Sequence, residues 1–198
     1  MNKVLILGNG PDINDINFDR LSGKVKTAGV NRIWLKHFPN YYFYHDYEIM
    51  KEIEIDPFIK SKVIAKCKCY SSDWIYTQTS DIPKYLKVIS RSNSKVFVDS
   101  VTTFMRVLIT DNIFSIDNTI FYIAGVPLSW SEPSHFWKTG GYSNSLNKNG
   151  KDWYDPRFKR IITNFKSLQN LGYNMVSVTP NSRLNKMMRY EGVSNLYA

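Results

Sequence analysis

A Gly-Asn-Gly-Pro turn at residues 8–11 directly follows the apolar stretch Lys3 to Leu7. Such a stretch is typical of a buried parallel strand, and ligands of open α/β sheets bind beyond the carboxyl ends of these strands. Gly8 and Gly10 lack side chains, so we expect a ligand to approach the backbone closely there. Ile13 stands where the dinucleotide pattern G-x-G-x-x-G requires glycine, which argues against that class of ligand. A tight strand-to-helix connection is the alternative explanation of the turn.

Three more apolar runs end in small or polar residues that could contact the same ligand. Residues 25–30 end at Asn31 and Arg32, residues 41–44 at His45 and Asp46, and residues 119–124 at Gly125. If these strands are parallel, their ends lie along one edge of a sheet. The amides of Asn9 and Asn31 both donate and accept hydrogen bonds, which suits a ribose or a pyrimidine edge. Asparagine is also common in turns, so ordinary turn chemistry stays open as an alternative.

A cluster of hydroxyl groups stands near the start of a helix predicted within residues 96–109. Val101, Phe104, Met105 and Leu108 are its expected apolar positions. Ser100, Thr102 and Thr103 could offer hydroxyls and backbone N–H groups to an anion. An ordinary helix cap would use the same residue types.

The elements that must position these residues alternate between strands and helices. This alternation predicts a single-domain α/β/α sandwich over residues 1–198, with a mainly parallel sheet. The clearest helix is residues 156–172, with apolar residues at helical spacing, Pro156 in the first turn and Gly172 at the end. A last strand over residues 174–179 leads into Pro180, Asn181 and Ser182. The polar stretch at residues 71–83 is predicted as loop, and residues 129–152 as a long lid or acceptor loop.

The charge of the chain is positive and unevenly distributed. The 198 residues carry a formal net charge of +9. Residues 138–191 contain ten basic and three acidic residues, which accounts for +7 of it. This asymmetry indicates an anionic partner such as nucleic acid or phosphates, and a solvated basic face is the alternative.

The remaining composition favours a cytoplasmic protein with a real apolar core. The hydrophobic share is 43%, and no run approaches the ~18 apolar residues of a membrane span. The first residues enter a strand without a basic-then-apolar signal segment. Cys67 and Cys69 form a C-x-C pair without further metal ligands nearby, so we expect inert reduced thiols.

Several of these stretches occur in an order that resembles a known enzyme family. KVLILGNGPDI, a strand ending in Asn31, SVTTFM, FYIAGV and VSVTPNS together resemble the bacterial sialyltransferases of the Campylobacter type. The resemblance implies a single-domain, GT-A-like glycosyltransferase fold that binds a nucleotide-sugar donor without a metal. It implies a donor pocket lined by Gly8, Asn9, Gly10, Pro11, Asn31, Arg32, His45, Asp46, Thr102, Thr103, Gly125, Pro180, Asn181 and Ser182.

The chain departs from the family at the catalytic base. The family has a histidine before the penultimate helix, and Asp155 takes this place here. An aspartate can remove a proton from an acceptor hydroxyl within hydrogen-bond reach, although Asp155 could equally cap the helix. His135 is the second candidate base. GVPLSW replaces the family's paired tyrosines, so the donor sugar need not be sialic acid.

Cofactor chemistry beyond the nucleotide-sugar co-substrate is not expected. Asp46 and Glu48 form a D-x-E pattern that is loosely similar to the metal-binding D-x-D of other glycosyltransferases. Acidic residues in the first turn of a helix explain the same pattern, so we do not expect a divalent metal.

The acceptor is the least constrained part of the prediction. Trp137, Lys138, Arg157 and Arg160 are the candidate acceptor-binding residues, because aromatic and basic groups suit both nucleic acids and sugars. Charge and size favour a viral glycosyltransferase that acts on a hydroxymethylated pyrimidine in DNA, within the host cytoplasm. The alternatives are a sialyltransferase-like enzyme acting on an oligosaccharide and a non-catalytic module that binds a nucleotide or nucleic acid. The sequence leaves the oligomeric state open.

Overall fold

The computed structural model describes residues 1–21, 23–44, 46–90, 99–128, 136 and 156–197. His45, His135, Trp137, Lys138 and Asp155 lie outside the described residues, and so does nearly all of the predicted loop at residues 129–152.

The described residues form one open sheet of eight strands, in the order β5-β4-β3-β2-β1-β6-β7-β8. Every neighbouring pair is parallel, which confirms the predicted α/β class. The strands are β1 Asn2–Leu7, β2 Lys26–Val30, β3 Tyr41–Phe43, β4 Lys68–Ser72, β5 Leu86–Ile89, β6 Thr119–Ala124, β7 Asn174–Ser177 and β8 Arg189–Tyr190.

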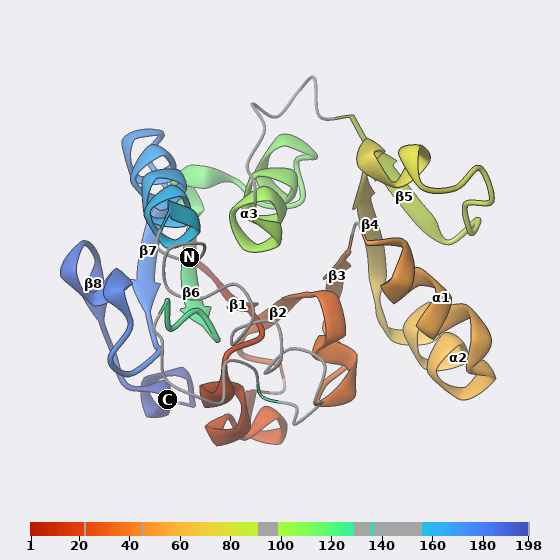
Figure 1. Ribbon diagram of the computed structural model, residues 1–198. Helices are drawn as coiled ribbons and strands as arrows, with labels where there is room; N and C mark the ends of the chain where they lie inside the picture. Colours follow the sequence, from red (N-terminus) through yellow and green to blue (C-terminus); the bar gives the residue numbers. More distant parts are fainter. Residues whose placement is uncertain (22, 45, 91–98, 129–135, 137–155, 198) are drawn as a thin grey trace.

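Helices and short 3₁₀ turns connect these strands and cover both faces of the sheet (Figure 1). The α-helices are α1 Tyr47–Ile55, α2 Pro57–Lys66, α3 Ser100–Thr110 and the helix of residues 156–170. The 3₁₀ turns are η1 Pro11–Asp15, η2 Phe18–Leu21, η3 Asn31–Leu35, η4 Asp73–Thr77, η6 Ile116–Asn118, η7 Arg183–Lys186 and η8 Val193–Leu196. Within the described part of the chain, no helix is long and apolar enough to cross a membrane.

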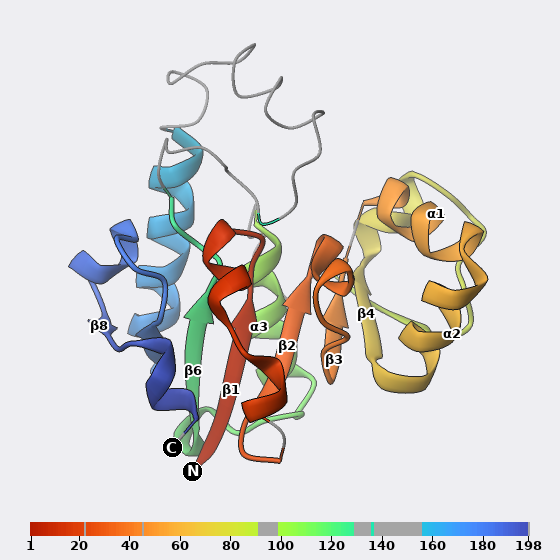
Figure 2. The ribbon, with the colours of Figure 1, turned by 90° about the horizontal axis from the view of Figure 1, so that it is seen from below.

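Two apolar clusters show which elements cover which face of the sheet. One cluster joins α3 and helix 156–170 to the face that carries Val4 and Ile6. The other joins η1, η2, α1 and α2 to the face that carries Leu5 and Leu7. Figure 2 shows η1 and η2 in front of β1, with α3 behind the sheet. The alternating side chains of β1 therefore serve both layers of the core.

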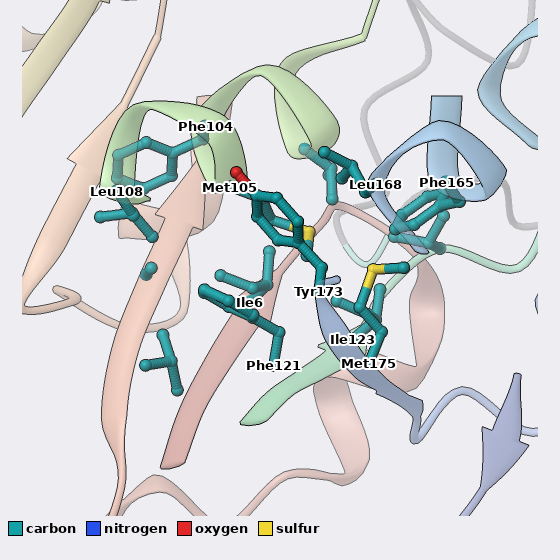
Figure 3. Packing of buried hydrophobic residues seen from close by; sticks show 14 of the residues in the cluster. Ile6, Phe104, Met105, Leu108, Phe121, Ile123, Phe165, Leu168, Tyr173 and Met175 are labelled. Carbon is teal, nitrogen blue, oxygen red and sulfur yellow. The ribbon is translucent and has the colours of Figure 1, made fainter. Parts of the chain in front are cut away.

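Helix α3 lies against the sheet through the apolar residues predicted for it. Phe104, Met105 and Leu108 are buried, and they pack with Ile6 and Phe121 of the strands (Figure 3). Burying each such side chain stabilises the fold by about 1.5–3 kcal/mol. The predicted apolar face of this helix is confirmed.

The direction of the strand order reverses between β1 and β6. The connections from β1 to β5 run along the face of η1, α1 and α2, whereas α3 and helix 156–170 connect the strands on the other face. Right-handed crossovers require this change of face when the strand order changes direction. In open α/β sheets, the ligand crevice lies outside the carboxyl ends of the strands at such a point. The relevant ends here are Leu7 and Ala124.

The structure adds elements that the sequence analysis did not predict. Helices α1 and α2 occupy residues 47–66, β5 follows the predicted loop, and β4 and η4 take up part of that loop. Asp56 caps α2 by accepting hydrogen bonds from the N–H groups of Phe58 and Ile59. The thiols of Cys67 and Cys69 are free, and burial raises the pKa of both, that of Cys67 to about 12. Both thiols therefore stay protonated at neutral pH, as expected for inert cysteines.

Candidate active site

The turns after β1 and β6 pack directly on each other at the reversal point. The N–H groups of Gly8 and Gly10 donate to the carbonyls of Ala124 and Gly125, each at 2.8 Å. A Cβ atom at Gly8 would lie 2.4 Å from the Gly125 oxygen. A Cβ atom at Gly10 would lie 2.6 Å from Cδ of Pro127. The space freed by the two glycines is therefore filled by the β6 turn, and not left open for a ligand as the sequence analysis expected.

Asp12 joins this pair of turns to the end of β7. Its Oδ2 atom accepts hydrogen bonds from the N–H of Gly125 at 3.0 Å and from the hydroxyl of Thr179 at 2.9 Å. Burial raises the pKa of Asp12, and these two hydrogen bonds oppose that rise. The carboxylate thus holds three strand ends together. Sequence reasoning missed it, because Asp12 and Thr179 lie 167 positions apart.

Asn9 presents an unsatisfied acceptor in the same turn. Its Oδ1 atom is buried, and no donor among the described residues reaches it. Its backbone carbonyl accepts from the N–H of Phe136 at 3.0 Å, and Asn14 Nδ2 donates to the Phe136 carbonyl at 3.1 Å. A buried acceptor without a partner costs about 1–3 kcal/mol. An N–H or O–H group of a ligand would remove that cost.

Asn31 follows β2 in a conformation that few residue types adopt. Its φ of 54° lies in the left-handed region, where asparagine is tolerated better than most residues. The Tyr42 hydroxyl donates to the Asn31 carbonyl, and the Ser100 hydroxyl donates to Asn31 Oδ1 at 3.4 Å. The start of α3 and the end of β2 therefore hold the Asn31 amide at the carboxyl edge.

The charge of Arg32 is compensated within the protein. Its Nε donates to Glu52 Oε2 at 2.8 Å, and a second guanidinium nitrogen donates to Oε1 of the same carboxylate. This two-point ion pair fixes the side chain on α1. The predicted contact of Arg32 with a donor stays a prediction, and it would have to compete with Glu52.

At the start of α3, Thr102 takes part in a helix cap. Asp99 Oδ1 accepts from the N–H of Thr102 at 2.8 Å, and Oδ2 accepts from the Thr102 hydroxyl at 2.5 Å. Thr102 is fully buried, and Thr103 is 6% exposed. Asn164 of helix 156–170 also donates to Asp99 Oδ2, at 2.8 Å. Ser100 contacts a predicted donor residue, Asn31.

The predicted residues after β7 differ in their exposure. Pro180 and Asn181 are exposed, and Asn181 has a φ of 57°. Ser182 is buried and caps η7, because its Oγ accepts from the N–H of Leu184 and donates to the Val126 carbonyl. Pro180 and Asn181 could therefore face a ligand directly, whereas the hydroxyl of Ser182 is occupied.

The described residues contain no ready set of metal ligands. Asp46 is half-buried immediately before α1, and its side chain does not cap the helix. Across residues 1–197, apart from the gaps in the described ranges, no group of three or more His, Cys, Asp or Glu residues could hold a metal ion.

The predicted acceptor residues Arg157 and Arg160 are exposed on helix 156–170. Seven basic residues and one acidic residue fall within residues 156–197. The exposed basic residues of this region are Arg157, Lys159, Arg160, Lys166, Lys186 and Arg189. This side of the molecule therefore carries a positive field.

Comparison with known proteins supports the fold and leaves the chemistry open. No family model matches the sequence, and no curated protein matches it. The sialyltransferase CstII from Campylobacter jejuni, solved in complex with CMP-3FNeuAc, has a similar structure, with a TM-score of 0.62 and 16% identity. The match covers 100% of this chain and 89% of CstII. A second CstII structure, in complex with a trisaccharide acceptor and CMP, gives a TM-score of 0.59 and 15% identity over 100% of this chain and 88% of that one. The chain thus has a divergent sialyltransferase-like, GT-A-like fold.

Proposed function

We propose that this protein is a glycosyltransferase that binds a cytidine-monophosphate sugar at the carboxyl edge of the sheet, beside β1 and β2. The observation that carries the proposal is the buried Oδ1 atom of Asn9, which has no donor among the described residues, at the reversal point of the strand order. The Asn31 amide, held by Ser100 at the end of the neighbouring strand β2, adds a second polar group. Both amides suit the hydroxyls of a ribose or the edge of a pyrimidine.

The nature of the nucleotide comes from the structural neighbours. CstII was solved with CMP and with CMP-3FNeuAc, and this chain shares its fold at 15–16% identity. In the proposed reaction, the bond between the anomeric carbon and the phosphate oxygen breaks. A new bond forms to the acceptor oxygen, and CMP departs with the electron pair. The acceptor proton passes to a base, for which Asp155 and His135 are the candidates. The protein would act chiefly by holding donor and hydroxyl in line.

Ligand-dependent thermal stability tests the donor directly. We expect CMP and CMP-sugars to raise the melting temperature by several degrees, with or without Mn²⁺, because only the folded state binds them. UDP, GDP and their sugars should raise it less. An Asn9→Ala variant should lose most of the CMP-induced shift, whereas Asn112→Ala, at an exposed turn far along the sequence, should keep it. A larger thermal shift with UDP than with CMP would indicate a uridine donor in place of the cytidine one. The absence of a shift with every nucleotide would overturn the proposal.

The acceptor divides the proposal into two candidates. The structure solved with a trisaccharide acceptor favours an oligosaccharide. The basic surface of helix 156–170 and η7 favours a second candidate, a polyanion such as DNA that carries hydroxymethylated pyrimidines. Transfer to DNA should weaken steeply between 50 and 200 mM salt, by roughly 10³-fold if six phosphates are contacted. Transfer to a neutral oligosaccharide should change little over the same range.

Turnover separates an enzyme from a binding module that has kept the fold. We expect Asp155→Asn or His135→Ala, whichever removes the base, to lower CMP release by 10²-fold or more while the CMP-induced thermal shift stays. A wild-type protein that binds CMP but releases none from CMP-sugars, with any acceptor offered, would be a non-catalytic nucleotide-binding module.

A further inference from the structure

A pocket of about 340 Å³ lies beside the reversal point, on the opposite side of the β1 turn from Asn31. Ala124 ends β6 and Pro180 follows β7, and both line the pocket, so it opens at the carboxyl edge of the sheet. Its other walls come from η1, β8 and the start of η8. The volume is within the range of small-molecule sites. Asn9, Asn31 and Ser100, on which the proposed nucleotide site rests, do not line it, whereas Pro180, one of the residues predicted for the donor pocket, does.

The charge of the walls restricts the ligand. Asp12 and Asp15 line the pocket, and no lysine or arginine is among its described lining residues. In a chain with a net charge of +9, this is a locally negative site. A phosphate, a carboxylate or a sialic acid would meet two carboxylates there, which costs binding free energy at short range. The pocket therefore favours an uncharged or cationic ligand and disfavours the nucleotide.

The remaining groups favour a sugar ring over a cation. Tyr190 is 46% exposed and its ring offers an aromatic face, while Ile16 and Val193 add apolar wall. The exposed Asp15 carboxylate can accept from hydroxyl groups, and the Ser194 hydroxyl can both donate and accept. Asp12 Oδ2 already accepts from Gly125 and Thr179, but its buried Oδ1 atom has no donor among the described residues and can accept one more hydrogen bond. Separate acceptors on Asp12 and Asp15, the Ser194 hydroxyl and an aromatic face match the several hydroxyls of a polyol ring better than a compact ammonium group.

We infer that this pocket binds an uncharged hexose unit of a glycan, in a subsite separate from the nucleotide. The inference rests on the proposed function only in assigning the sugar to the acceptor, since binding itself requires no donor. A second sugar contact at this edge would orient a larger acceptor by adding binding free energy away from the reacting hydroxyl.

Saturation-transfer NMR on the full chain tests the pocket with defined sugars. The probes are galactose, glucose and N-acetylglucosamine, with N-acetylneuraminic acid as the anionic probe and putrescine as the cationic one. We expect transfer to at least one neutral sugar, with a millimolar dissociation constant, and none to the other two probes. Stronger binding of N-acetylneuraminic acid or putrescine, or no binding of any neutral sugar, overturns the inference.

Matched variants locate the binding. Tyr190→Ala and Asp15→Asn should weaken the neutral sugar at least tenfold, whereas Tyr76→Ala and Asp117→Asn, at exposed positions on other elements, should leave it unchanged. Gly192→Leu adds a side chain at the pocket lining, where the backbone φ is −66° and a Cβ meets only Ser194 Oγ at 3.5 Å. It should therefore fold normally and still lose the sugar. Equal losses in the pocket and control variants would place the sugar elsewhere.

The CMP-induced thermal shift distinguishes a failure of the sugar pocket from a failure of the proposed nucleotide donor. All three pocket variants should retain the thermal shift caused by CMP, because none of them touches Asn9 or Asn31. Loss of sugar binding in the pocket variants, together with a CMP-induced thermal shift that matches the wild type, is the signature of this pocket. Sugar binding without any response to nucleotides would retain the pocket and overturn the proposed donor, and a CMP response without sugar binding would do the reverse.

Discussion

At the scale of single residues, the polar side chains at the carboxyl edge of the sheet are of two kinds. Some form hydrogen bonds that hold the turns together, and others have polar atoms that a ligand could contact. The hydroxyls of Thr102 and Ser182 and the Oδ2 atom of Asp12 are occupied by neighbouring turns and caps, while Asp12 Oδ1 has no partner among the described residues. Asn9 keeps a buried oxygen without a partner among the described residues, and the Asn31 amide is held by Ser100. Sequence motifs do not separate the two groups, because both consist of small polar residues near strand ends.

Gly8→Ala tests whether the first turn is shaped by protein contacts. The added Cβ would lie 2.4 Å from the Gly125 oxygen, a backbone atom that cannot move without displacing the β6 turn. We expect the free energy of unfolding to fall by roughly 1–3 kcal/mol, as for overpacking at a rigid site. Urea denaturation monitored by circular dichroism measures it. Gly192→Ala is the control, and a cost within 0.5 kcal/mol of that control would contradict the contact.

At the scale of elements, α3 and helix 156–170 are joined through one carboxylate. Asp99 caps α3 and also accepts from Asn164, which is 9% exposed. Because Ser100 follows directly and contacts Asn31, this joint sets the position of the candidate site as well as the packing of the two helices. The pKa of Asp99 is raised overall, because the effect of burial is larger than the opposing effect of the hydrogen bonds from Thr102 and Asn164.

A double-mutant cycle on Asp99 and Asn164 measures that joint. Asp99→Ala removes a cap worth about 0.5–2 kcal/mol and also leaves the Asn164 amide without its acceptor. We expect a loss of stability of about 2–4 kcal/mol, with a coupling of about 0.5–3 kcal/mol between the two positions. Asp56 caps α2 through N–H groups of that helix, so Asp56→Ala should lower the free energy of unfolding by less than Asp99→Ala does. Additive effects of Asp99→Ala and Asn164→Ala would show that the helices are not linked there.

At the scale of the whole molecule, the stability against acid should depend on the half-buried imidazole of His37. His37 stacks on Phe18 with ring centroids 4.2 Å apart, and its Nε2 lies 3.2 Å from the Thr27 hydroxyl. Burial, assisted by the charge of Lys66, lowers the pKa of His37 to about 4. The unfolded chain therefore binds more protons than the folded one between pH 6.5 and 4, and stability falls as the pH falls through that window.

Replacement of His37 by glutamine should remove this dependence. We expect the wild type to lose about 1–2 kcal/mol more than His37→Gln between pH 7 and 4, once solvent screening is allowed for. Asp12 and Asp99 have raised pKa values, which favour the folded state as the pH falls, but they contribute equally to both proteins. Urea unfolding at several pH values gives the difference. Parallel profiles for the two proteins would show that His37 titrates normally.

The fold was predictable where apolar runs are continuous, and less so elsewhere. The strands at Leu7, Val30 and Phe43 and the helix around Phe104 follow from local patterns. The strand β8 has two exposed residues and no apolar run, and only Val63 of α2 is fully buried, so neither has a clear pattern. The order of the strands is not local information, and the contacts of Asp12 with Gly125 and Thr179 depend on it. The unsatisfied Asn9 oxygen could be located only once that order was known.

The central position of β1 has a consequence during synthesis on the ribosome. β1 pairs with β2 on one side and with β6 on the other, and 111 residues separate Leu7 from Thr119. At the usual ~5–20 residues per second, the second edge of β1 would wait roughly 6–22 s for its partner strand. Throughout that interval the apolar stretch Val4 to Leu7 presents an open edge, the kind of surface on which nascent chains associate wrongly. A chaperone that shields this stretch should therefore matter more to the yield of folded protein than one that acts on the completed chain.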